Sequence, residues 1–249
     1  MTLDEVLRTV AERVPYLAAS TVIEGDDWIG CDTLVTDPAA LTKVVRASAR
    51  GFGTDDEVVA ASLFTESYAF RVAGTALVAF ALDLPVPDLA PTSVAVRIDK
   101  PRPSAVAYLD PLGRGLDADA LAGALIAVHL GPFVAVMHEA FRVGERNLWG
   151  NVAAACAVAF RAVHASAVGS DGRERIRARA EAFFDACAPD FDGLGAFTAV
   201  QHAGRQGWYW DRASCCLWFR TTGSELCDNC SLIDPSELYE RRVAELSVS

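Results

Sequence analysis

Four of the seven cysteines lie close together near the C-terminus, and their thiolates are the groups in this chain best suited to bind a metal. The segment 212–230 reads RASCCLWFRTTGSELCDNC and contains Cys215, Cys216, Cys227 and Cys230. The spacing is C-C-x10-C-x2-C, and soft thiolate ligands in such a group select zinc or an iron–sulfur cluster. We therefore predict a metal or cluster site rather than unrelated cysteines or a redox disulfide.

The spacing favours a cluster over a single zinc ion. A zinc ribbon normally has two C-x2-C knuckles, whereas here only Cys227 and Cys230 form one. Cys215 and Cys216 are adjacent, and a regular extended backbone would direct their side chains to opposite faces. An adjacent pair needs a turn, or it serves a larger inorganic core.

This segment resembles the C-terminal signature of the FhuF-type ferric-siderophore reductases, in which R-x-S-C-C-x10-C-x2-C binds a [2Fe–2S] cluster. Arg212, Ser214 and the four cysteines stand at the matching positions. A weaker similarity covers residues 129–132 (HLGP) and residues 148–151 (LWGN), which we place at the start of a helix. Residues before about 120 cannot be matched by motif.

The resemblance implies one-electron reduction of a ferric siderophore, of the hydroxamate type or another, by a [2Fe–2S] cluster bound to the four cysteines. Hard oxygen ligands hold Fe(III) much more tightly than Fe(II), so one electron loosens the metal for cellular use. No catalytic residue beyond the cluster is implied. Because the chain has no G-x-G-x-x-G fingerprint, we expect an external electron donor such as a ferredoxin, a flavodoxin or a flavin reductase.

Aromatic and basic residues near the cysteines are candidates for docking the siderophore or the electron carrier. For the aromatic residues 208–210, 218 and 219 we favour anchoring and covering of the cluster over a substrate-binding wall. The arginines near the cysteines either form a local basic patch or are ordinary solvated side chains. They are residues 205, 212, 220, 241 and 242. Asn151 either caps its helix or bonds the cysteine segment. The candidate docking residues are Arg142, Arg146, Trp149, Asn151, Trp210, Arg212, Trp218 and Arg220.

The other sulfur and imidazole side chains have plainer interpretations. Cys31, Cys156 and Cys187 are predicted to pack as small hydrophobic residues. His129, on an apolar helix face, is predicted to be a core residue. His202 is nearest in sequence to the cysteines and could tune the cluster through a hydrogen bond.

Composition limits the partners and the location. Lysine and arginine total 22 against 33 aspartates and glutamates, and the net charge of −11 argues against a nucleic-acid partner. The N-terminus has acidic residues where a secretion signal needs basic ones. The apolar stretch 72–84 is short for a membrane span and contains Asp83. We expect a cytoplasmic protein without an integral membrane segment.

Periodicity predicts an α+β fold with a predominantly helical body. The apolar stretch 54–82 is one long helix or two helices broken near Gly74. A further helix ends at Gly131-Pro132, which is a stop and restart signal, and another helix continues from there. Alternating residues predict a β-hairpin near 93–110. Residues 190–233 are predicted to be irregular, followed by a terminal helix. We expect a helix-rich body with substrate-docking residues (1–189) and a [2Fe–2S]-binding module (190–249).

Two other functions fit the same cysteines. In the first, the protein is a binding protein whose C-terminus is stapled by zinc. In the second, it is an iron–sulfur redox carrier or sensor with no siderophore substrate. The bound metal distinguishes the first alternative from a reductase, and reoxidation by ferric siderophores distinguishes the second.

Overall fold

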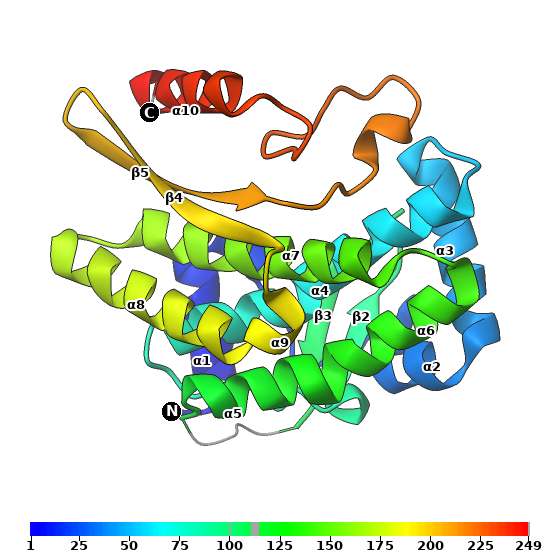
Figure 1. Cartoon of the computed structure of the whole chain (residues 1–249). Coiled ribbons are helices and arrows are strands. Elements are labelled where there is room, and N and C mark those ends of the chain that lie inside the picture. The colour runs from blue at the N-terminus through cyan, green and yellow to red at the C-terminus, as the bar shows by residue number, and fades with distance from the viewer. Residues whose placement is uncertain (100, 111–114, 249) are drawn as a thin grey trace.

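The computed structural model describes residues 1–99, 101–110 and 115–248, which are mainly helical with two small antiparallel sheets. The predicted α+β class with a helical body is confirmed (Figure 1). The helices along the chain are α1 (Leu3–Arg13), α2 (Cys31–Thr36), α3 (Pro38–Phe52), α4 (Glu57–Ala81), α5 (Ala118–Ala122), α6 (Gly131–Phe141), α7 (Glu145–Ser166), α8 (Ser170–Ala186), α9 (Ala188–Phe191) and α10 (Pro235–Val248).

Helix α4 lies at the centre of the body and is buried along most of its length. It begins where the Asp56 carboxylate accepts hydrogen bonds from the Val58 and Val59 amides. The helix continues through Gly74, so the alternative of two helices is wrong. A Cβ at Gly74 would lie 2.5 Å from Cδ2 of Leu17. This glycine therefore permits close packing and does not break the helix.

The predicted restart at Gly131-Pro132 coincides with the start of α6 at Gly131, but the predicted stop before it is wrong. Residues Gly123–Leu130 form a π-helix that joins α5 to α6 without interruption. Pro132 lies in the first turn of α6, where a proline is tolerated.

The predicted hairpin near 93–110 is confirmed. Strands β2 (Val94–Arg97) and β3 (Ala105–Tyr108) pair antiparallel, and β1 (Trp28–Gly30) adds a third strand that the sequence did not predict. The predicted turn over 100–104 includes Lys100, which lies outside the described residues. Buried Tyr108 joins this sheet to α4 by donating a 2.8 Å hydrogen bond to the Val72 carbonyl.

A second hairpin corrects the prediction that residues 190–233 are irregular. Strands β4 (Gly195–His202) and β5 (Arg205–Arg212) pair along their full lengths. Ala203 and Gly204 make the two-residue turn with positive φ angles of 49° and 78°. Asparagine or aspartate normally occupies the first of these positions, so the sequence lacks the dipeptide that signals such a turn.

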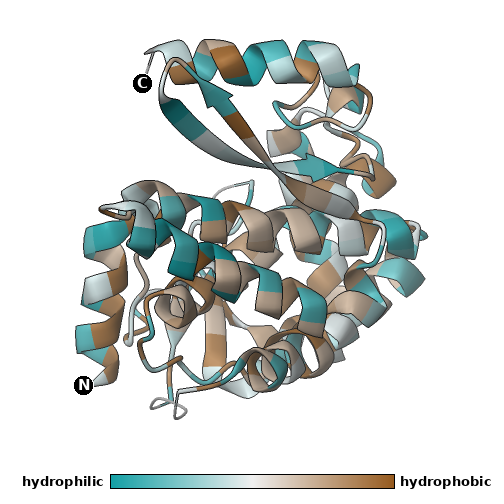
Figure 2. Cartoon of the chain, turned by 60° about the vertical axis from the view of Figure 1, so that its left-hand side comes forward, coloured by the Kyte–Doolittle hydropathy of each residue, from teal (hydrophilic) through white to brown (hydrophobic). Residues whose placement is uncertain are grey.

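The C-terminal layer, which we define as residues 195–248, lies across one side of the helical body, which we define as residues 1–191 (Figures 1 and 2). Trp208 packs against His164 of α7 with ring centroids 5.0 Å apart, and the Trp210 ring lies 4.9 Å from that of Phe184 of α8. Both tryptophans are buried. They anchor the hairpin to the body, which is the role we favoured for these aromatic residues.

Two helical segments among the described residues are long and apolar enough to cross a membrane by length and composition: Ala118–Phe141 and Glu145–Ser166. The sequence analysis considered only the shorter stretch 72–84. The apolar window in α7 is 72% buried inside the protein, and that of Ala118–Phe141 is 50% buried. Core helices of folded proteins pass the same test, so the two segments are weak evidence for a membrane span.

Candidate functional site

The four clustered cysteines belong to one loop, the cysteine loop (residues 213–233), which connects β5 to α10. Cys216 and Cys230 are buried, and Cys215 and Cys227 are partly exposed. Leu217 adopts a left-handed backbone conformation with φ of 68° directly after the adjacent pair. This provides the turn that adjacent cysteine ligands were expected to need.

Backbone amides point at two of the sulfur atoms. The Leu217 amide donates to Sγ of Cys215 at 3.4 Å, and the Leu232 amide donates to Sγ of Cys230 at 3.5 Å. At the C-x2-C end, the Cys230 amide donates to the Cys227 carbonyl at 3.0 Å and closes a tight turn. Hydrogen bonds to cysteine sulfur stabilise thiolates and are one of the means by which proteins set the potential of an iron–sulfur cluster.

Two sulfur atoms from opposite ends of the loop already lie at a spacing that suits one metal ion. Sγ of Cys216 and Sγ of Cys227 are 3.7 Å apart. Two thiolates on one tetrahedral ion with bonds of about 2.3 Å would be about 3.8 Å apart. The four cysteines of the loop supply an all-thiolate donor set, which suits a [2Fe–2S] cluster.

The contact between these two cysteines favours a thiolate at Cys216. The hydrogen bond from Cys227, with a smaller contribution from the nearby Arg212 guanidinium, lowers the pKa of Cys216 to about 7. The same hydrogen bond raises the pKa of Cys227. Burial raises the pKa of Cys215. The thiolate is the form of cysteine that binds metal.

A buried polar network holds the cysteine loop against α4 and α7. The Arg212 guanidinium donates to Oε1 of Glu66 at 3.0 Å and also to Oδ1 of Asn151. Nδ2 of Asn151 donates to the carbonyl and to Oγ of Ser62, at 2.8 and 2.9 Å. Oγ of Ser62 in turn donates to the Cys216 carbonyl at 2.9 Å. Glu66 also offsets part of the cost of burying the Arg212 charge.

Helix α7 adds two further contacts to the loop. Nδ2 of Asn147 donates to the Cys215 carbonyl at 3.2 Å. Gly150 faces Ser214 so closely that a Cβ at position 150 would lie 1.7 Å from Oγ of Ser214. Within the described residues, Oγ of Ser214 and Nε1 of Trp210 are buried without a hydrogen-bond partner. The W-G-N sequence of α7 therefore presents a glycine and an asparagine to the cysteine loop.

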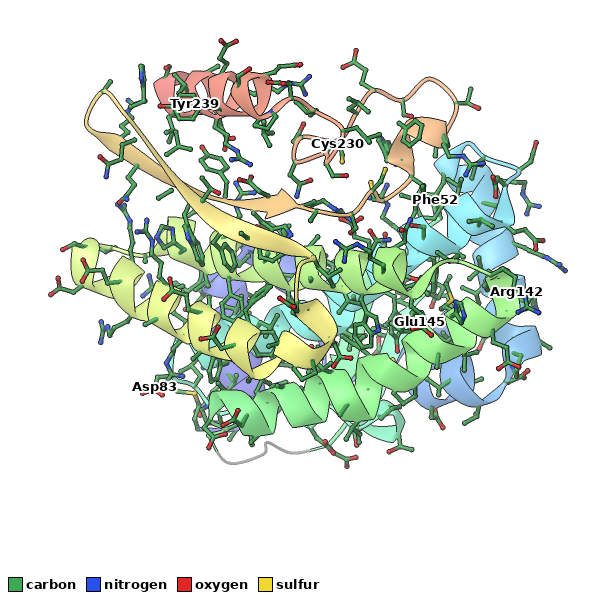
Figure 3. The ribbon with its side chains drawn as sticks, viewed as in Figure 1. Phe52, Asp83, Arg142, Glu145, Cys230 and Tyr239 are labelled. Carbon is green, nitrogen blue, oxygen red and sulfur yellow. The ribbon has the colours of Figure 1, made fainter. Side chains whose placement is uncertain are left out.

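Only part of the predicted docking set lies near the cysteines. Helix α7 begins at Glu145, so Asn151 is an interior residue that accepts a hydrogen bond from Arg212 at the end of β5, and it is not a helix cap. Arg146 donates to the Gly193 carbonyl at 2.6 Å, and Trp149 packs against Phe191 with ring centroids 6.3 Å apart. Arg142 is exposed at the end of α6, while Cys230 lies in the loop above α7 (Figure 3).

The arginines of the C-terminal layer are mostly held by partners within the protein. Arg220 pairs with Asp56 at 2.6 Å, and Arg241 pairs with Glu237 at 2.6 Å. Arg242 pairs with Asp211, and Arg205 donates to the Leu246 carbonyl at 2.7 Å. The proposed basic patch is therefore largely a set of structural arginines.

A cleft of about 590 Å³ opens onto the cysteine loop, and its volume is in the range of small-molecule binding sites. The sequence analysis named Arg212 and Trp218, which line it, and missed the contributions of α3, α4 and the connection between β2 and β3. The motif match did not reach those segments, so no signal pointed to them. The lining residues are Phe52, Leu63, Glu66, Ser67, Phe70, Arg71, Arg102, Pro103, Ala155, Val158, Arg212, Cys216, Trp218, Glu225, Leu226, Cys227, Asp228 and Asn229.

A second cleft of about 440 Å³ shares Val158 and residues 227–229 with the first. It is bounded by α7, β5, α10 and the cysteine loop, and its charged lining residues are Arg161, Asp228, Arg241, Arg242 and Glu245. Cys227 thus lines both clefts.

The remaining predictions concern residues away from the clefts. Cys31, Cys156 and Cys187 are buried in the core, as expected. His129 is fully buried between the Tyr68 hydroxyl, 2.7 Å from Nε2, and the Leu89 carbonyl, 2.6 Å from Nδ1, which confirms a core role. His202 lies at the turn of the β4–β5 hairpin, at the opposite end of β5 from the cysteines. The predicted hydrogen bond from His202 to the cluster is therefore wrong.

The comparisons with known proteins match this organisation. Residues 212–232 match the FhuF 2Fe-2S C-terminal domain, which identifies an iron–sulfur protein with a [2Fe–2S] cluster. Residues 62–207 match the family described as ferric iron reductase FhuF-like transporter, and the chain belongs to this family. Neither the curated proteins nor the solved structures gave a match. The two matched regions together contain α4, α7 and the cysteine loop, which the buried polar network joins.

Proposed function

We propose that this protein is a cytoplasmic ferric-siderophore reductase whose [2Fe–2S] cluster is held by Cys215, Cys216, Cys227 and Cys230. The bound cluster would supply the single electron that converts siderophore-bound Fe(III) to Fe(II). The observation that carries the proposal is the cleft of about 590 Å³ that opens directly onto Cys216 and Cys227. A ferric complex in this cleft would lie beside two of the four thiolate ligands.

The residues around the loop have separate tasks in this proposal. The amides of Leu217 and Leu232 donate to ligand sulfur atoms and favour their charged form. Arg212, Asn151 and Ser62 fix the position of the loop on α4 and α7. Trp218 contributes apolar surface to the cleft. The chain's part is to bind and orient the ferric complex, because the reduction requires no covalent bond to be broken in the ligand.

The electron is proposed to come from a separate carrier, a ferredoxin, flavodoxin or flavin reductase. The second cleft gives this carrier its own approach to Cys227, which lines it. We further propose that residues 1–189 form the body of the reductase, that residues 190–249 form its cluster module, and that the two segments of 118–141 and 145–166 remain part of the folded body.

Metal and redox measurements test the proposal. The protein should contain two irons and two acid-labile sulfides per chain after anaerobic purification, and a reduced-state EPR signal should appear after dithionite treatment. Ferric trihydroxamates should then reoxidise the reduced cluster in stopped-flow absorbance measurements. One zinc per colourless chain would overturn the cluster assignment. A normal cluster that no ferric siderophore reoxidises would leave an iron–sulfur carrier or sensor.

A further inference from the structure

The cleft beside Cys216 and Cys227 contains two arginines that the cysteine network does not use. Arg71 comes from α4, and Arg102 comes from the connection between β2 and β3. In the described part of the chain neither guanidinium forms an ion pair, whereas Arg212 in the same cleft is paired with Glu66. Two cations without a carboxylate partner on one wall of a cleft are an unusual arrangement in a protein of net charge −11.

The two guanidinium groups are held in place by uncharged groups. Nε of Arg71 donates to the Pro103 carbonyl at 3.1 Å, and Nη1 donates to the Tyr16 carbonyl at 2.8 Å. Nη2 of Arg71 has no hydrogen-bond acceptor among the described residues. Arg102 lies over the Phe52 ring at 5.6 Å from its centroid. Because an arginine has five N–H donors, both side chains retain donors for a ligand.

The two charges are close enough to affect each other. Burial, followed by the positive charge of Arg102, lowers the pKa of Arg71. An anion bound between the two groups would relieve this repulsion and form charge-assisted hydrogen bonds with both.

The cysteine loop contributes charge of the other sign to the same cleft. Glu225 and Asp228 line the cleft from this loop, and neither forms an ion pair with a described residue. A complex that is anionic at its metal centre would be repelled there, next to the thiolates. A ligand with a neutral iron chelate at the loop and a negative group at Arg71 and Arg102 would match both sets of charges.

We propose that Arg71 and Arg102 bind a peripheral carboxylate of the ferric siderophore, so that the preferred substrates are ferric chelates with a neutral iron centre and a pendant anionic arm. This inference rests on the proposed function, because it assigns the substrate class of the same cleft. The arm would be held at the Arg71 and Arg102 wall while the chelated iron faces Cys216 and Cys227.

A matched pair of ligands tests this inference. A linear trihydroxamate with a pendant ammonium group and its N-succinylated derivative, with a pendant carboxylate, coordinate iron identically and differ in the charge of the arm. Their gallium(III) complexes cannot be reduced under these conditions, so their Kd values for the holo-protein can be measured by tryptophan fluorescence. The carboxylate complex should bind at least about fivefold more tightly than the ammonium complex. A fivefold ratio of Kd values corresponds to the upper end of the free energy measured for one exposed ion pair.

Variants at Arg102 are preferable because this side chain is exposed and makes no backbone hydrogen bond in the described region. Arg102→Gln should reduce the preference for the carboxylate complex to about twofold or less. Arg102→Glu should reverse this preference, and Arg102→Lys should retain most of it. Arg50→Gln is the matched control, because Arg50 is exposed two residues from Phe52 but does not line the cleft. The control should keep the wild-type preference.

The outcomes separate this inference from the proposed function. Equal binding of the two gallium complexes, with both iron complexes reoxidising the dithionite-reduced cluster, would overturn the inference and leave the reductase standing. An unchanged preference in Arg102→Glu would also overturn it. If neither complex binds and neither iron complex reoxidises the cluster, both proposals fail. Because no electron carrier is present in these assays, a loss of preference cannot come from impaired carrier docking.

Discussion

The helical body and the C-terminal layer are stabilised by different kinds of interaction. The core of the body is apolar and is built around α4, where even the polar side chains Ser62, Thr65 and Thr75 are buried with hydrogen bonds to backbone carbonyls. The cysteine loop contains little regular structure and is positioned by a few polar contacts to α4 and α7.

This contrast shows how one protein can combine a stable framework with a site that depends on its cofactor. The body buries enough apolar surface to fold without a metal. The loop has small apolar clusters of its own, around Cys230, Ile233 and Leu238. Its order is expected to depend on both the polar network and the cluster.

The largest expected effect is loss of the cluster without loss of the body. Cys227→Ser or Cys230→Ser should remove the [2Fe–2S] absorbance and EPR signal, while the far-UV circular dichroism of the helical body remains. Cys187→Ala, a core cysteine of the body, should keep the cluster. A normal cluster spectrum in both serine variants would show that the ligands are other residues.

A smaller effect should follow from removing the centre of the polar network. Asn151→Ala removes an acceptor for the buried Arg212 and two donor contacts to Ser62. The free energy of unfolding should fall by about 2–3 kcal/mol, and iron content should fall with it. Asn147→Ala, which removes one hydrogen bond at a partly exposed site, should cost about 1 kcal/mol. Equal costs for the two variants in urea unfolding would contradict a central role for Asn151.

Acidification should weaken the body through His129. Burial lowers the pKa of this imidazole to about 4, whereas an unfolded histidine titrates near 6.5. Between these values the unfolded state binds more protons, so this contribution to stability is full above about pH 6.5 and is lost as the pH falls toward 4. The NMR signals of His129 should remain those of a neutral ring at pH 5.5. A midpoint near 6.5 in the folded protein would refute this prediction.

The smallest expected effect tests the contact between the two regions and has a distinctive sign. Glycine-to-alanine changes in helices normally stabilise by up to about 1 kcal/mol. Gly150→Ala should instead destabilise by about 1–2 kcal/mol, because its Cβ would collide with Ser214. Gly172→Ala in α8 is the matched control and should stabilise, since its nearest atom would be 3.7 Å away. The second change Ser214→Gly should restore the stability of Gly150→Ala. Stabilisation by Gly150→Ala alone would show that the helix and the loop are not in close contact.

Local signals in the sequence predicted much of the fold, and the failures have identifiable causes. The β2–β3 hairpin followed from alternating residues, whereas the β4–β5 hairpin was missed because Ala203 occupies a position with positive φ. The predicted stop before Gly131-Pro132 was wrong because residues Gly123–Leu130 form a π-helix that joins α5 to α6. Asn151 was placed at a helix start together with residues 148–151, whereas α7 already begins at Glu145.

The sequence by itself determined the donor chemistry, because four thiols at C-C-x10-C-x2-C spacing specify soft-metal binding wherever the loop lies. It also determined the helical body, because helix caps and apolar periodicity are local properties. Only the tertiary structure decided what faces the cysteines. Residues 62, 66, 71 and 102 are far from the loop in sequence, and they reach it or its cleft because α4 and the β2–β3 connection pack beside it. Contacts between distant segments depend on the packing of whole elements, which spacing along the chain does not encode.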